Sequence, residues 1–148
     1  MKDHNRNRLA TITGRYTARL RDKTELDRRA FDAAFLEVRE AIIRPVLEEI
    51  AVELRSAGHG AVVECDTANE TPSIALVLRI GSTPKVDSDR VVFAVIHRRS
   101  PIEVLAYFVV RPPAIDIRRF ASPAEIAAEQ IEQIVVDAVE HIFACYSL

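Results

Sequence analysis

Two histidines and two cysteines, which are residue types that often bind metals, give the chain one candidate zinc site. His141 and Cys145 are four apart, so on a helix they would share a face, and Cys65 and His97 would complete a tetrahedron. The four residues follow none of the spacings that recur among zinc ligands. Cys145 also continues an apolar helical stripe. We therefore expect no metal site, and we interpret both cysteines as small buried side chains.

Charged residues in the predicted strands supply two further candidates. Glu64 and Asp66 are two apart, so in a strand they would face the same way and could act as paired carboxylates. Solvated charges on an edge strand explain them more simply, because such charges suppress aggregation. His59 lies between glycines and fits an exposed turn. Arginines near strand ends suggest an anion site, although charges are common there: Arg79, Arg98, Arg99 and Arg111.

The motifs of common enzyme classes do not occur in the sequence. There is no phosphate-binding loop, dinucleotide fingerprint, nucleophile elbow, HExxH pattern or EF-hand loop, and glycine occurs only four times. Catalytic groups that meet only in space leave no such spacing. No catalytic residue and no cofactor is therefore predicted, and the protein is expected to be non-enzymatic.

Charge is divided unevenly along the chain. Residues 1–23 contain seven lysines and arginines against two aspartates, a net +5 within a chain of −2, so residues 24–148 sum to −7. Such a basic arm resembles a nucleic-acid-binding tail in composition, because each arginine can neutralise a phosphate. The acidic remainder would repel nucleic acid. We therefore favour pairing of the basic arm with the acidic body of the same or a neighbouring subunit.

The basic arm (residues 1–23) lacks a sustained apolar period. Ile12, Tyr16 and Leu20 could form one short amphipathic helix, and the arm is otherwise expected to be mobile or dependent on a partner. Thr24 and Asp27 form an approximate capping box, and Glu25 suits the positive end of a helix dipole. A helix is therefore predicted to begin at Thr24.

This helix should be long and interrupted. Its apolar stripe comprises Phe31, Phe35, Val38, Ile42, Val46, Ile50, Leu54 and Ala57. Gly58 and Gly60 end it, and Pro45 should kink it because proline cannot donate to the carbonyl of Ala41. About thirty residues span about 50 Å, whereas a domain of this size has a radius of gyration of about 15 Å. The helix must bend at Pro45 or overhang the domain and pack on another chain.

Four β-rich runs follow, at residues 61–66, 73–80, 90–98 and 102–111. Their short connections leave no room for crossover helices, so they should form a four-stranded antiparallel meander. The third and fourth runs are apolar on both faces, which indicates cover on both sides of the sheet. Residues 112–120 are interpreted as a connection, with a short edge strand left open.

A C-terminal helix completes the predicted fold. Ser122, Pro123 and Glu125 supply an N-cap, an N1 proline and an N3 glutamate, and the helix should continue to the C-terminus. Two helices on one side of a four-stranded sheet make an α+β two-layer sandwich. Residues 24–148 are therefore predicted to form a single domain.

The composition excludes several classes of protein. With 148 residues, 49% apolar and 28% charged, the chain is neither disordered nor fibrous, and no apolar run approaches the roughly 20 residues of a membrane span. The first residues lack the apolar region of a secretory signal, and the two distant cysteines suit a reducing compartment. A cytoplasmic location without membrane contact is expected.

These patterns lead to three functional hypotheses. The first is a non-enzymatic, self-associating interaction module, a homo-oligomer whose other protein partner is unknown, based on the overlong helix and the doubly apolar strands. The second is a small nucleic-acid-associated protein that uses residues 1–23. The third is a small-ligand-binding protein or enzyme with a pocket between the helices and the sheet.

Overall fold

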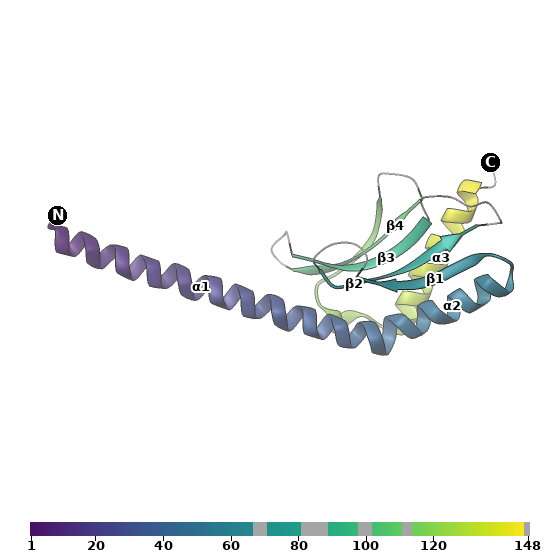
Figure 1. Ribbon diagram of the computed structural model, residues 1–148, viewed down its shortest axis with the longest axis horizontal. Helices are drawn as coiled ribbons and strands as arrows, with labels where there is room; N and C mark the ends of the chain where they lie inside the picture. Colours follow the sequence, from purple (N-terminus) through teal and green to yellow (C-terminus); the bar gives the residue numbers. More distant parts are fainter. Residues whose placement is uncertain (67–70, 81–88, 98–101, 111–113, 147–148) are drawn as a thin grey trace.

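The structure is a computed structural model that describes residues 1–66, 71–80, 89–97, 102–110 and 114–146. A long helix, a meander of strands and a final helix follow one another along the chain (Figure 1). The elements are α1 (Asp3–Val38), the π-helix η1 (Arg39–Ile43), α2 (Arg44–Ser56), β1 (Gly60–Cys65), β2 (Ser73–Arg79), β3 (Asp89–Ile96), β4 (Glu103–Val109), β5 (Ile115–Phe120), the 3-10 turn η2 (Pro123–Glu125) and α3 (Ala128–Tyr146).

The first helix begins at Asp3, so the predicted start at Thr24 is wrong. The Thr24 hydroxyl donates to the carbonyl of Leu20 at 2.9 Å, as an interior helix residue does, and it caps nothing. Between Asp3 and Thr24 the chain has no proline and a single glycine, Gly14, so helix propensity is not interrupted. The basic arm is therefore helical, and it projects away from the rest of the molecule (Figure 1).

The kink predicted near Pro45 is confirmed. The Arg44 N–H donates to the carbonyl of Arg39, five residues back, so one wide π-turn precedes the proline. Pro45 then stands in the first turn of α2, directly after this wide turn, and it has no N–H to donate to the carbonyl of Ala41. The chain changes direction between α1 and α2 (Figure 1).

Helix α2 ends in a Schellman motif, as the glycines predict. The His59 N–H donates to the Leu54 carbonyl at 3.0 Å and the Gly58 N–H to the Arg55 carbonyl at 3.0 Å. Gly58 has φ of +93°, a conformation that side chains with a Cβ rarely adopt.

We expect Gly58→Ala to lower the free energy of unfolding by about 1–2 kcal/mol, the cost of a left-handed Cβ. A Cβ there would meet no atom within 4 Å, so the loss comes from the backbone alone. Urea denaturation measures it. Gly14→Ala, in an exposed helix interior with equally open surroundings, is the control and should not destabilise the protein. Equal stability of the Gly58 variant and the parent would contradict the assignment.

The sheet is an antiparallel meander in the order β1-β2-β3-β4-β5, and the described strands number five, not the four predicted. The extra strand, β5, pairs with β4, with Tyr107 opposite Asp116 and a register shift between Ala106 and Tyr107. The charged residues of β5 interrupt the alternation of apolar and polar residues by which a strand is recognised in a sequence. The other strands lie within two residues of their predicted bounds.

Helices α2 and α3 pack on one face of the sheet and form the main core with it (Figure 1). The largest buried side chains include Phe35, Phe93, Phe120, Ile43, Leu47 and Ile131. The opposite face, here called the outer sheet face, holds a small second cluster of Ala75, Val92 and Ala94, against which Val77 and Tyr107 pack. Both faces of β3 are therefore apolar, as predicted.

The capping signals at Ser122 do not begin the last helix, so its predicted start is wrong. Ser122 is extended and makes no side-chain capping bond, and residues 123–125 form a single 3-10 turn. Ile126 is extended and buried, which separates this turn from α3. The Glu125 carboxylate accepts from the Ala121 N–H at 3.1 Å, so the glutamate caps the turn instead.

Candidate functional site

The structure does not bring together the four residues considered as zinc ligands. Cys65 lies beside an arginine and His97 beside an aspartate, while the ring of His141 packs against Phe108 with centroids 4.9 Å apart. Cys145 is a free, half-buried thiol on α3. Among the residues that the structure describes, no three histidine, cysteine or acidic side chains are grouped as a metal site requires.

The two other predicted histidine positions have structural roles. His97, just after β3, places Nε2 2.8 Å from Oδ1 of Asp32 on α1, and both side chains are mostly buried. This contact ties the root of the projecting helix to the sheet. His59 packs edge-on against Phe143 of α3, with ring centroids 4.9 Å apart.

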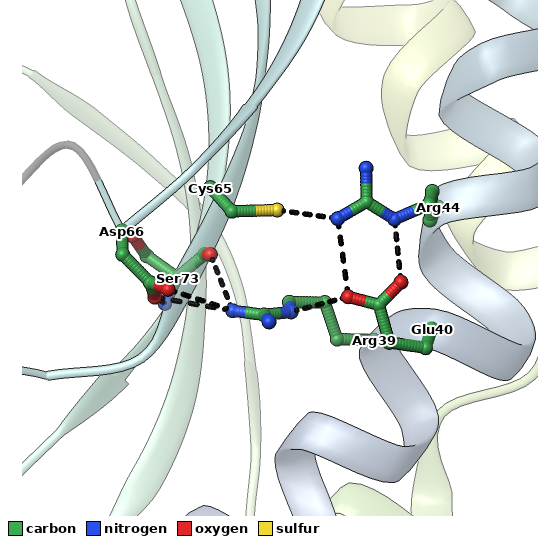
Figure 2. A network of polar contacts seen from close by, with 6 residues as sticks. All are labelled: Arg39, Glu40, Arg44, Cys65, Asp66 and Ser73. Carbon is green, nitrogen blue, oxygen red and sulfur yellow. Dashed lines mark hydrogen bonds and ion pairs between the residues drawn. The ribbon is translucent and has the colours of Figure 1, made fainter.

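Arg39, within the π-turn, is the centre of a polar network (Figure 2). Its Nη1 donates to both carboxylate oxygens of Asp66, at 3.1 and 3.2 Å, and to the Ser73 carbonyl at 3.3 Å. Asp66 follows β1 with φ of +57° and also accepts from the Ser73 N–H at 3.1 Å. One carboxylate thus joins the kink of the helix to the connection between β1 and β2.

Arg44 forms the second half of this network (Figure 2). Its guanidinium donates to Glu40 at 2.5 and 3.1 Å and to Sγ of Cys65 at 2.8 Å. The hydrogen bond from Arg44 holds the pKa of Glu40 below its ordinary value. The network therefore positions the kink, and nothing in its geometry indicates covalent chemistry.

The remaining predicted candidates do not form a site together. Asp66 lies beyond the end of β1 and is bound by Arg39, whereas Glu64 is exposed on the strand, so the two carboxylates are not paired for acid-base chemistry. Arg79 is exposed at the end of β2, beside Gly60. Arg98, Arg99 and Arg111 lie outside the described residues.

The basic arm is the most unusual surface of the protein. Every residue from Met1 to Asp27 is exposed. Leu9, Ile12, Tyr16 and Leu20 recur at steps of three and four, so they form one stripe along the helix, and each is more than half exposed. Spacings of seven and four place arginines 8, 15 and 19 in a row beside this stripe.

The outward surface of α2 and α3 has the opposite charge. We call it the acidic helix face; its exposed acidic residues are Glu48, Glu49, Glu53, Glu129, Glu132, Asp137 and Glu140. Helix α3 contains no lysine or arginine, and the two arginines of α2 donate to Glu40 and to the Ala61 carbonyl. Each helix also exposes one valine, Val52 and Val136.

Comparison with protein-family models, curated proteins and solved structures finds no match to this chain. In the described part of the chain, none of the helices combines the length and the apolar character needed to cross a membrane. The basic arm and the acidic helix face are therefore the features from which a function can be argued.

Sequence reasoning identified the arm by its charge but missed the network at the kink. Glu40 and Arg44 are four apart, which is the spacing of a helical ion pair, and this local signal precedes Pro45 directly. The contact of Arg39 with Asp66 joins residues 27 apart and has no local signal.

Proposed function

We propose that the protein is a non-enzymatic, self-associating interaction module in which the basic arm of one copy binds a second copy. The body that receives it is the two-layer sandwich of residues 24–148. The observation that supports this function is the exposed apolar stripe on a helix that buries no side chain before Arg28. In proteins most of the stability of a helix comes from packing an apolar face and not from helix propensity. A partner that covers the stripe would supply that packing.

The partner must be another molecule because α1 is continuous from Asp3 to Val38. The arm points away from its own α2 and α3, and it could reach them only by breaking the helix (Figure 1). Charge favours a second copy as that molecule, since the arm carries +5 and the remaining residues −7.

We expect full-length protein to be a dimer or larger at about 50 μM, and Ile12→Ser with Tyr16→Ser to make it monomeric. Burying each side chain contributes about 1.5–3 kcal/mol, so losing both should weaken association about 100-fold or more. Light scattering measures the mass. At a protein concentration low enough for the parent to be monomeric too, the two proteins should have the same melting temperature, because both residues are exposed in the single chain.

The matched control is Asn7→Ser with Thr11→Ser. These residues lie on the side of the arm opposite the stripe, and the substitutions leave the charge unchanged. This control should associate like the parent. A full-length protein that stays monomeric at high micromolar concentration would exclude self-association.

The row of arginines supports nucleic-acid binding as the second candidate function. Arg8, Arg15 and Arg19 face one side of an exposed helix, where each could contact a phosphate. Titration with duplex DNA at about 50 and 200 mM salt separates this function from the first, because binding through a few phosphate contacts weakens steeply with salt. The fully buried side chains between helices and sheet give no support to a ligand pocket there.

A further inference from the structure

We infer that the surface receiving the basic arm is the acidic helix face of the second copy, and that two copies exchange arms reciprocally. This inference rests on the proposed self-association and names its interface. Three surfaces could cover the arm of another copy: a second arm, the outer sheet face and the acidic helix face.

Pairing of two arms is disfavoured by charge and by length. Each arm carries +5, so like charges would be brought together along the whole contact. The apolar stripe runs only from Leu9 to Leu20, less than two heptads, whereas coiled coils sustain the pattern over three or four. Arg19 and Lys23 occupy positions where a longer seam would need apolar side chains.

The outer sheet face lacks the negative charge that the arm requires, although Val62, which lies on this face by register, is 55% exposed. Ala75, Val92 and Ala94 are already 95% or more buried within the single chain. The charged residues that share this face by register are three of each sign: Glu64, Glu103, Asp116, Arg79, Arg90 and Arg119. An arm of +5 gains little from a surface of balanced charge.

The acidic helix face complements the arm in charge, and it also exposes apolar side chains. Glu132, Val136 and Glu140 follow one another at steps of four on α3, so an exposed valine lies between two carboxylates. The arm offers the converse arrangement, an apolar stripe beside a row of arginines. Apolar contact along the stripe and arginine–carboxylate pairs at its border can therefore form together.

The area available favours exchange of two arms over binding of one. Residues 3–23 form a helix about 32 Å long, and a contact strip about 10 Å wide covers roughly 300 Å². A stable interface buries about 800 Å² on each partner. If each copy both donates an arm and receives one, the contact doubles and the two-fold symmetry closes the assembly as a dimer.

Two charge-reversed proteins test the inference. Arg15→Glu with Arg19→Glu reverses two charges of the arm, whose net charge falls from +5 to +1. Glu132→Arg with Glu140→Arg reverses the two carboxylates on either side of Val136 on the acidic helix face. Each protein alone should associate at least about tenfold more weakly than the parent, because like charges then meet in both contacts. An equimolar mixture should form a heterodimer, since each arm again finds a face of opposite charge. Light scattering and analytical ultracentrifugation measure the masses, and melting curves verify folding.

The control reverses charge on the outer sheet face instead, with Glu64→Arg and Asp116→Arg. We expect its association to match that of the parent. If this protein dissociates and the Glu132/Glu140 variant does not, the outer sheet face is the receptor and the inference is wrong, although self-association stands. If the Glu132/Glu140 variant self-associates normally while Ile12→Ser with Tyr16→Ser is monomeric, the acidic helix face is likewise excluded. A monomeric parent would overturn both proposals.

Discussion

Phe35→Asp should leave the chain unfolded at 25 °C. Phe35 is fully buried, and it is the one residue of α1 that enters the main core completely. An unpaired carboxylate there costs several kcal/mol, against a total stability of about 5–15 kcal/mol for a domain. Ile131→Asp, at an equally buried position on α3, should have the same result. Circular dichroism and urea titration measure the loss.

Leu36, the residue after Phe35, provides a control that introduces the same carboxylate. Leu36 is 38% exposed, so Leu36→Asp can keep its carboxylate in water and should cost less than about 1 kcal/mol. If Phe35→Asp melts within a few degrees of the parent, the helical stripe has been assigned to the wrong face.

Asp66→Ala should have the second largest effect, a loss of about 2–4 kcal/mol from the free energy of unfolding. The substitution removes the carboxylate that accepts from Arg39 and from the Ser73 N–H, and it places alanine at positive φ. A lost hydrogen bond with a charged group costs about 1.5–3 kcal/mol, and left-handed backbone adds about 1–2. The exposure of Asp66 reduces the ionic part of this loss.

Asp66→Asn separates the causes of that loss. Asparagine tolerates positive φ and keeps one acceptor oxygen, so this variant should lose less than half as much stability as Asp66→Ala. Guanidinium denaturation of both proteins at neutral pH makes the comparison. Equal losses would mean that charge alone, and not the turn geometry, accounts for the contribution of Asp66.

Much of the fold could be predicted because the local sequence patterns agree with the way the residues pack in the core. The strands from β1 to β4 alternate or are continuously apolar, and the kink follows from the missing N–H of Pro45. The elements that were missed lack such agreement. The arm is helical through propensity alone, without an apolar face that packs on the core, and β5 carries Asp116, Arg118 and Arg119 where alternation is expected. At α3, Ile126 is drawn into the core and interrupts the capping pattern.

Of the candidate functional surface, only the distribution of charge could be predicted from the sequence. The excess of arginines and lysines in residues 1–23 can be counted, but the direction in which a helix projects depends on the geometry of the kink. Contacts such as Arg39 with Asp66 and His97 with Asp32 join distant parts of the chain, so no spacing indicates them. The doubly apolar strands suggested a missing layer, yet Ala75, Val92 and Ala94 on the outer sheet face are already buried within the single chain.

The π-turn before Pro45 makes α1 a lever. From Asp32, where His97 holds the helix, to Asp3 is about 44 Å of rigid rod, so a rotation of roughly 5° at that root displaces the tip by about 4 Å. The direction in which Ile12 and Tyr16 are presented is therefore determined mainly at the base of the projecting helix, by the contacts of Asp32 and Arg39. A substitution at either position should redirect the arm without altering any residue of its apolar stripe.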